Sequence, residues 1–441
     1  MIFDILMCIN IFLLTILKGG FFSSDMSMYI FITTIIFSAY VFVKRKEIKI
    51  DKLDILFLLF SLSFVLPIIF TNVPNLNASI YEFLKYFSVF MSFFIIRRGN
   101  IKRYICMLVI CALIQGFLGI DQLGNKYLLE FLRNFNTGYL TKHMNRLSGT
   151  LQYANTTAIL LTISSIFVFK KLIERTKENI NKNTNKNTNK SIIQNKIIFV
   201  IFNLLNIFLL LTDSRIPFII YIILLCVYMK KNIFIALTSL VFSFLAYINI
   251  TSMNFQNIYV LTITYMIAAY LIAPYIIKIN NFNNKYINIS VIIILILMLL
   301  IPNNLTTRLK EYIKNPESES IRIEYIKDGF KMFKDSPIVG RGGEAFRYLH
   351  KEYQDIKYTS TEMHSSILQI FLETGLIGGI LLLAIIYFSL KINFSFISLA
   401  YLLHLCVDLN FAFLFGVIIF IILICYKDKN KENNNDIYKN R

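Results

Sequence analysis

The sequence predicts an all-α fold, a polytopic transmembrane helical bundle of about 12 to 14 spans with a large extracytoplasmic loop that contains short amphipathic helices. The first indication is composition, because 56% of the 441 residues are hydrophobic, against roughly 45–50% in soluble domains. The second is the recurrence of apolar runs of about 15 to 23 residues, the length that crosses a hydrocarbon core of ~30 Å at 1.5 Å per residue. The third is one long polar stretch, 302–365, that separates the earlier runs from the later ones.

The apolar runs divide the chain into five segments. They are N-terminal transmembrane helices over 1–148, central ones over 149–301, the extracytoplasmic loop over 302–365, C-terminal helices over 366–426 and a cytoplasmic tail over 427–441. The expected spans are 3–17, 27–43, 54–70, 79–96, 104–120, 149–169, 197–212, 216–230, 233–249, 258–277, 288–301, 366–388, 393–408 and 411–426.

A low-complexity segment interrupts the central helices. Residues 181–190 read Asn-Lys-Asn-Thr-Asn-Lys-Asn-Thr-Asn-Lys. Such a sequence has almost no apolar surface to bury, so it cannot offset the entropy that ordering would cost. We expect a disordered cytoplasmic linker over 170–196.

The distribution of Lys and Arg predicts which ends of the spans face the cytoplasm, because short cytoplasmic loops are enriched in these residues. If the spans alternate, the basic runs at 44–46, 97–98, 170–171, 230–231 and in the tail fall on one side. The formal net charge of +19 is then mostly a topology signal, and the expected partner is the lipid bilayer, with no nucleic acid. The outer side holds 121–148, 213–215 and 302–364.

The outer loop contains the pattern of an amphipathic helix. Over 318–333, Ile and aromatic residues recur at helical spacing, which predicts a helix that lies on the membrane or roofs a cavity. A Gly-rich turn at 340–343 precedes a second expected helical piece, 344–352. The apolar positions of the first helix are Ile323, Ile326, Phe330 and Phe333.

Several motifs for cofactors and metals are missing from the sequence. It has no G-x-x-x-x-G-K-[ST] loop for ATP, no D-x-D pair for a metal-bound nucleotide sugar, and no H-x-x-H, H-E-x-x-H or Cys/His cluster. All six cysteines lie in apolar runs, so an outer disulfide framework is not expected. We therefore expect no cofactor and no metal. Any activated substrate comes from elsewhere, and a lipid-linked donor already in the membrane fits that requirement.

Two residues at outer ends of expected spans are candidates for catalysis. His364 ends the loop just before the span 366–388, where a proton-handling group meets the basic side chains of the loop. Arg215 opens the span 216–230, against both the helix dipole and the charge bias of outer loops, so a bound phosphate would explain its presence. The alternatives are an interfacial histidine, and an arginine that pairs with Asp213 or reaches the interface.

Other outer basic residues are candidates for substrate binding. Arg322 precedes the amphipathic stripe, and Arg341 lies in the Gly-rich turn, where backbone can approach a ligand closely. Arg146 and Lys142 precede the span that begins at 149 and belong to the same set. Because the loop also holds many acids, most of its charges are expected to be solvated or paired.

Several short motifs occur in a fixed order over about residues 145 to 385. They are G-T-L-Q-Y-A-N-T-T-A from Gly149, the Ser214-Arg215 pair, Arg322 with Tyr325, P-I-V-G-R-G-G-E-A-F from Pro337, H-S-S-I-L-Q from His364 and L-E-T-G-L-I-G from Leu372. In this order and membrane context they resemble the bacterial O-antigen ligase and polymerase superfamily.

The resemblance implies a metal-independent membrane glycosyltransferase of the C type in the cytoplasmic (plasma) membrane of a bacterium. Such an enzyme moves a glycan from a polyprenyl diphosphate carrier to an acceptor hydroxyl, on a glycan or a lipid, at the outer face. By resemblance, Arg215 and Arg322 contact the diphosphate and His364 activates the acceptor. The family more often has Asn where Ser365 stands and Trp where Tyr325 stands, so the identity of the acceptor stays open.

Other classes of membrane protein fit part of the pattern. A secondary transporter or flippase of a lipid-linked glycan would also have many spans, but it is expected to carry ionisable residues in mid-span and to show repeat symmetry. Here the charges cluster at outer ends and no internal repeat is evident, although Glu82 and Lys85 fall inside an expected span. A structural scaffold would leave the ordered motifs unexplained. Polymerase and ligase activities both remain open.

Overall fold

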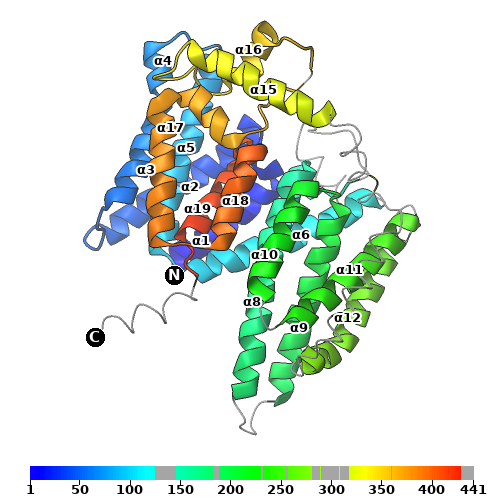
Figure 1. Cartoon of the computed structure of the whole chain (residues 1–441). Helices are drawn as coiled ribbons and strands as arrows, with labels where there is room; N and C mark the ends of the chain where they lie inside the picture. Colours follow the sequence, from blue (N-terminus) through cyan, green and yellow to red (C-terminus); the bar gives the residue numbers. More distant parts are fainter. Residues whose placement is uncertain are drawn as a thin grey trace, which may run out of the picture. The chain divides into compact units, whose positions relative to one another are not determined.

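A computed structural model gives the positions of most of the chain. Within the described residues the chain forms helices joined by short turns, without strands, and the prediction of an all-α polytopic bundle is confirmed (Figure 1). The expected span 288–301, apart from position 289, and the candidate Lys142 lie outside these residues. The structure describes residues 1–124, 146–181, 188–229, 232–253, 257–280, 317–358 and 360–428, with the single positions 289 and 307.

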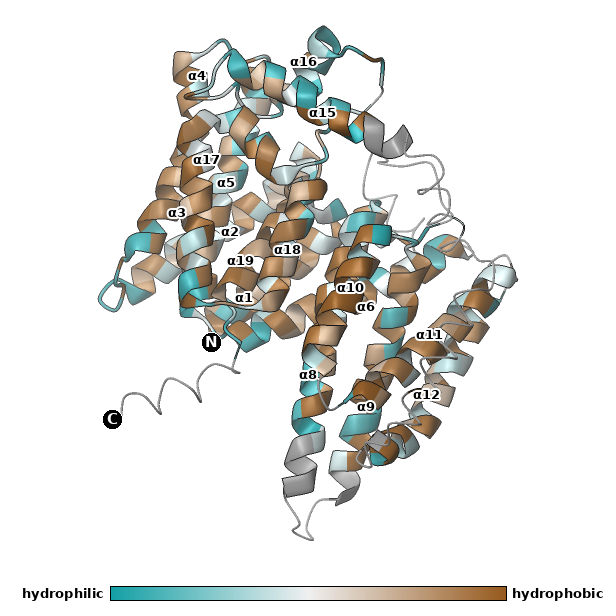
Figure 2. Ribbon diagram, viewed as in Figure 1, coloured by the Kyte–Doolittle hydropathy of each residue, from teal (hydrophilic) through white to brown (hydrophobic). Residues whose placement is uncertain are grey.

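In this described part, nine helices are long and apolar enough to cross a membrane. Four shorter apolar helices of 10–17 residues accompany them. Each expected span that falls on described residues coincides with one of these helices. In Figure 2 most residues of these helices have the colour of hydrophobic residues, whereas α15 (Glu317–Lys334) and α16 (Ala345–Tyr353) mix polar and apolar residues.

The chain forms two compact units, and the first comprises Met1–Met107 and Glu317–Arg441. Its C-terminal helices pack among its N-terminal ones, since α17 contacts α3 and α19 contacts α5. This unit therefore joins segments that the sequence treats separately: the first helices, the outer loop and the last helices. Its membrane helices are α1 (Ile2–Ile16), α2 (Ser23–Lys44), α3 (Lys52–Ser63), α4 (Leu66–Phe70), α5 (Leu76–Arg98), α17 (Ser366–Ile392), α18 (Phe396–Val407) and α19 (Leu414–Cys425), with the start of α6 (Ile101–Leu123).

The Gly-rich turn of the outer loop and a pair of basic residues, Arg97 and Arg98, lie at opposite ends of α5. At the C-terminal end of this helix, Arg98 forms a salt bridge with Asp54, the last residue of a capping box at the start of α3. Near its N-terminal end, the Gly-rich turn of the loop packs so closely that a Cβ atom on Gly343 would lie 2.7 Å from Cβ of Glu82. About 22 Å of helix separate Glu82 from Arg97 at 1.5 Å per residue. The predicted topology requires this separation, and which end faces outward stays a prediction.

The second unit, Leu108–Pro316, is a bundle in which α8 packs on α9 and α10, and α9 on α11 and α12. A short 3₁₀ turn, η2 (Gly149–Leu151), leads into this bundle. Gly149 has a φ of 59°, and a Cβ atom there would lie 2.3 Å from Oε1 of Gln115, so the turn requires glycine. The helices are α8 (Ala154–Asn181), α9 (Thr188–Leu211), α10 (Arg215–Met229), α11 (Ile233–Ser252) and α12 (Ile258–Asn280).

The prediction of a disordered linker over 170–196 is wrong for much of that segment. Helix α8 continues to Asn181 and α9 begins at Thr188. Extending an existing helix costs less free energy than nucleating a new one, so a polar sequence can continue an apolar span. The extension also buries Leu172 and Ile173. Residues 182–187 lie outside the described part.

Candidate active site

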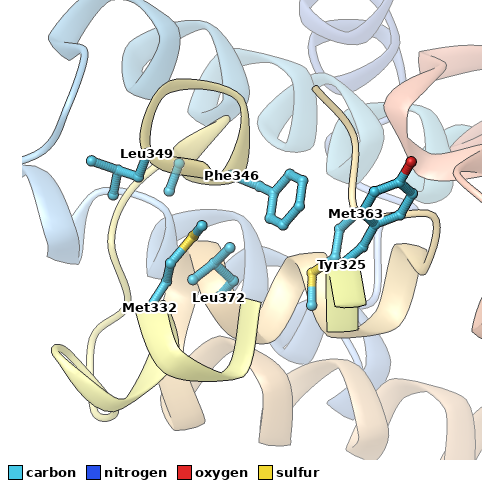
Figure 3. Close-up of a cluster of buried hydrophobic side chains, with 7 residues drawn as sticks. Tyr325, Met332, Phe346, Leu349, Met363 and Leu372 are labelled. Atoms are coloured by element: carbon cyan, nitrogen blue, oxygen red, sulfur yellow. The ribbon is translucent and has the colours of Figure 1, made fainter. Parts of the chain in front are cut away.

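The outer loop is anchored on α17 by a small apolar core that α15, α16 and the start of α17 build together (Figure 3). Burying a large apolar side chain contributes roughly 1.5–3 kcal/mol, so this core is sufficient to hold the loop in one place. The buried side of α15 carries Tyr325, Asp328 and Met332, whereas the predicted stripe is its more exposed side, with Ile323 and Phe330 more than half exposed. The core residues are Tyr325, Met332, Ala345, Phe346, Leu349, Met363 and Leu372.

Two glycines interlock the Gly-rich turn with α17. Helix α17 is broken at Gly375, which has a φ of 66°. Across the break, N–H of Arg341 and Gly342 donate to the carbonyls of Leu372 and Glu373 at 2.9 and 3.0 Å. A Cβ atom on Gly340 would lie 2.4 Å from the carbonyl of Glu373, so only glycine allows this approach. The motifs around Gly340 and Gly375 are thus two halves of one structural joint.

Buried carboxylates beside this joint are held by hydrogen bonds and ion pairs. The carboxylate of Glu373 accepts hydrogen bonds from N–H of Glu344 and from Gln369, at 3.0 and 2.9 Å. Arg347 forms salt bridges with Glu344, at 2.8 Å, and with Glu362. Burial raises the pKa of Glu362 above its ordinary value, although Arg347 acts in the opposite direction. These charges are paired, as expected for most of the loop.

His364 occupies a strained turn at the start of α17. Its φ is 55°, a left-handed conformation that is uncommon for residues other than glycine and that clusters at functional sites. Ser365 is the N-cap of α17, and its hydroxyl accepts from N–H of Leu368 at 3.5 Å. Both Ser and the family's more frequent Asn are good N-caps, so this departure leaves the cap intact. The ring of His364 stacks on Tyr325 at 5.5 Å between ring centres and 20° between planes.

Asp408 is a residue near His364 that the sequence reasoning missed. It follows α18, and its backbone carbonyl accepts from both N–H and the hydroxyl of Ser366, at 3.0 and 2.7 Å, which fixes it against the first residue of α17. Its carboxylate is fully buried and lies 3.7 Å from Nε2 of His404. The available signal was an acidic residue between two apolar spans, which by itself is a functional hypothesis in a membrane protein.

The electrostatic environment keeps the imidazole of His364 neutral. Burial lowers the pKa of His364 to about 4; Asp408 raises it, and Arg322 lowers it further. At neutral pH the ring therefore has a lone pair available to accept a proton. Among the described residues, its Nδ1 atom is buried without a hydrogen-bond partner. An unpaired buried polar atom costs free energy, which is commonly tolerated where a ligand or substrate interacts.

His350, the other described histidine of the outer loop, is bound differently. Its Nδ1 atom lies 3.2 and 3.0 Å from the carbonyls of Phe346 and Arg347, and its ring stacks on Phe346. It is buried in the core of the loop. His350 is therefore a structural residue of α16, and the structure distinguishes it from His364.

The candidate arginines of the first unit lie on different parts of the loop. Arg322 on α15 acts electrostatically on His364 and is half-buried one turn before Tyr325. Arg341 is fixed through its backbone to Leu372, and its Nε atom is buried without a hydrogen-bond partner among the described residues. The structure thus brings Arg322 together with His364, and it places Arg341 in the glycine joint.

The second unit carries the other candidates, Arg146 and Arg215. Arg146 donates to the carbonyl of Thr212 at 2.8 Å, to Ser214 at 2.8 Å and to Asn155 at 3.1 Å. It therefore braces the turn that leads into α10, and Asn155 of the Gly149 motif belongs to the same network. Arg215 is the first residue of α10 and is half-buried.

The described residues contain no group of three or more His, Cys, Asp or Glu side chains that could hold a metal ion. The cationic group that acts on His364 is the guanidinium of Arg322, and a planar guanidinium matches the oxygens of a phosphate. The chemistry that these residues can perform is proton transfer by a neutral imidazole beside a fixed positive charge.

Comparison with known proteins agrees with the motifs. Residues 198–383 match a family model described as O-antigen ligase. The matched region contains Arg215, Arg322, Arg341 and His364, and the match confirms the resemblance to the O-antigen ligase and polymerase superfamily. No curated protein matches the chain.

Proposed function

We propose, from the premise that this chain is a member of the O-antigen ligase and polymerase superfamily, that it transfers a glycan from a polyprenyl diphosphate carrier to an acceptor hydroxyl. The observation that carries the proposal is the environment of His364. A neutral imidazole in a strained turn at the mouth of a membrane helix lies beside a buried carboxylate and under the influence of an arginine. This combination suits a general base next to an anionic leaving group.

In the proposed reaction, His364 accepts the proton of the acceptor hydroxyl as the oxygen attacks the anomeric carbon. The bond between that carbon and the diphosphate oxygen breaks, and the polyprenyl diphosphate leaves with the electron pair. Arg322 stabilises the charge that builds on the diphosphate, and Arg215 is proposed as a second contact. The carrier bond is already activated, so the reaction requires no ATP.

Binding of the diphosphate would also adjust the base. Burial is the main cause of the lowered pKa of His364, and Arg322 lowers it further in the free protein. An anion bound at Arg322 offsets that positive charge, so it raises the pKa of His364 by removing this smaller contribution. Asp408 then stabilises the imidazolium that forms. His364 would thereby be a stronger base in the complex with the diphosphate than in the free protein.

The experiment is transfer by the purified full chain in lipid nanodiscs, with a polyprenyl-diphosphate glycan as donor. Production of free polyprenyl diphosphate together with a longer glycan or a glycosylated lipid is the expected result. A second carrier-linked glycan as acceptor tests polymerase activity, and a different lipid acceptor tests ligase activity. Movement of intact donor across a vesicle membrane without a glycan product would contradict transfer and favour the flippase alternative.

A further inference from the structure

An apolar groove lies beside His364, between α15 and the first turns of α17. Its volume is about 320 Å³, within the range of small-ligand pockets, about 300–1,000 Å³. Lys327 is the one charged side chain among the described residues that line it. The apolar walls are formed chiefly by Ile326, Phe330, Phe333, Met363, Leu368 and Phe371.

The groove exists because α15 has a glycine where it faces Met363. A Cβ atom on Gly329 would lie 2.3 Å from Cε of Met363, so the absence of a side chain there leaves room for Met363, which lines the groove. The walls are not packed away from the surface. Ile326 is 40%, Phe330 56% and Leu368 37% exposed. The loop thus keeps a row of apolar side chains accessible at the level where α17 begins.

The end of the groove adjoins the candidate base. Met363 is the residue before His364, and Tyr325, next to Ile326 on α15, stacks on the His364 ring. Arg322 lies one turn further along α15. Over Glu317–Lys334, α15 carries as many acidic as basic residues, and the cation that it places toward His364 is Arg322, whose planar guanidinium suits an anionic head. The other wall belongs to α17, a helix long and apolar enough to cross a membrane.

Resting on the function proposed above, we infer that this groove holds the isoprene units next to the diphosphate of the carrier lipid. The head lies at the His364 and Arg322 end, and the chain runs past Phe330 and Leu368 into the bilayer. A bilayer is already as apolar as the groove, so binding there adds little affinity. What the groove supplies is position, because it restrains the reacting diphosphate beside the base.

The test compares two donors that carry the same glycan diphosphate, one with a full polyprenyl chain and one with a chain too short to reach the groove. Leu368→Trp fills the groove. Leu383→Trp on the same helix is the matched control, because Leu383 is 47% exposed and does not line the groove. We expect Leu368→Trp to lower kcat/KM for the polyprenyl donor by about tenfold or more, and to leave the short-chain donor and the control within about twofold.

A second measurement keeps the inference testable if the variant fails to fold. A photoactivatable polyprenyl diphosphate should label residues 326–333 of the wild-type protein, and excess unlabelled polyprenyl diphosphate should prevent it. Equal labelling by a photoactivatable phospholipid would overturn the inference. So would a Leu368→Trp variant in which kcat/KM falls equally for both donors, or falls for neither. If the wild type transfers glycan from neither donor, the proposed function fails, and the labelling alone then decides whether the groove binds the carrier.

Discussion

Two turns of this protein have the same local form and different surroundings. In each, a residue with a positive φ is followed by a serine and then by the first residue of a membrane helix: His364, with a φ of 55°, leads into α17, and Asp213, with a φ of 48°, leads into α10. Asp213 accepts a hydrogen bond of 2.6 Å from the hydroxyl of Tyr247. Nδ1 of His364, by contrast, is buried without such a partner among the described residues.

The serines of the two turns also differ in their hydrogen-bond partners. Ser365 caps its own helix, whereas the hydroxyl of Ser214 accepts from Arg146, an arginine outside its turn. A residue with a positive φ before a helix therefore sets the direction of its side chain. The hydrogen bonds of that side chain then indicate whether the turn has a structural role or has a polar group available to a substrate. On this comparison, the His364 turn is the one suited to chemistry, and the turn before Arg215 is a braced support for a cation.

The largest expected effect is that of removing the base. His364→Ala should lower transfer by about 10²–10⁴-fold, the usual contribution of a general base. Membrane levels should be normal, because the side chain is half-buried and its Nδ1 atom makes no hydrogen bond within the described part. The measurement is turnover by purified protein in nanodiscs.

His350→Gln is the matched control for that variant. It can still donate to the carbonyls of Phe346 and Arg347, so its transfer per folded molecule should stay near the wild-type value. Near wild-type turnover by His364→Ala would contradict a catalytic role for the His364 turn, and His364 would then be an interfacial residue.

Next in size is the contrast between the two arginines of the second unit. Arg215→Lys should lower turnover by about 10²-fold if its guanidinium supports the leaving diphosphate, because an ammonium cannot reproduce the planar donor arrangement. Arg146→Lys should instead lower thermal stability, since hydrogen bonds to a charged group contribute about 1.5–3 kcal/mol each and several are disturbed. Equal loss of stability in both variants would contradict the assignment of different roles.

The glycine joint is predicted to be a stability element. Gly340→Ala should destabilise the protein by about 1–3 kcal/mol, because alanine disfavours a φ of 83° and its Cβ atom would meet backbone of Glu373. The measurement is the Tm of the full chain, with Ser336→Ala, a change at a half-buried neighbour that is expected to cost less than Gly340→Ala, as control. An unchanged Tm in Gly340→Ala would mean that the loop is not held by this joint.

Much of this structure could be predicted from local patterns, and the remainder depends on contacts between distant segments. The spans and the helix over 318–333 follow from hydropathy and periodicity, which are local properties. The role of Gly375 does not, because its φ is explained only by the approach of Gly340, and Asp408 becomes relevant only through its contact with Ser366. The prediction of a disordered linker over 170–196 failed because it used the composition of the segment alone. It did not consider that the helices on either side could extend into the segment.

The candidate residues show the same division. His364 was identified by its position at a span end, and its neighbours Tyr325 and Arg322 by motif. The sequence grouped Arg146 with the substrate-binding residues because it is basic and outside, but the structure gives it hydrogen bonds to Thr212, Ser214 and Asn155. Charge and topology thus indicate where an arginine lies, and the hydrogen-bond partners indicate whether it is engaged in support.

A smaller effect is expected in the titration of His364. Its pKa of about 4 reflects burial, with Asp408 raising and Arg322 lowering it. Arg322→Gln should therefore raise this pKa, and Asp408→Asn should lower it. Because the base acts when neutral, activity should fall as pH drops through the pKa of His364, and the acid limb of kcat/KM should move to higher pH in Arg322→Gln. NMR of labelled histidine measures the shift directly, and an opposite order of the two variants would exclude these neighbours as the cause.

The smallest effect is expected from chelation. If Arg322 and Arg215 neutralise the leaving diphosphate, transfer should be unchanged in EDTA, because a guanidinium supplies the positive charge without a metal. The described residues offer no cluster of three His, Cys, Asp or Glu that could hold an ion in their place. The measurement is turnover with and without EDTA, with restoration by Mg²⁺ or Mn²⁺ as the decisive arm. Activity that is lost on chelation and restored by either ion would mean that a metal carries the charge at the diphosphate. Both turns would then be scaffolding around a metal-dependent reaction, and the distinction between an available histidine and a braced aspartate would no longer identify the catalytic one.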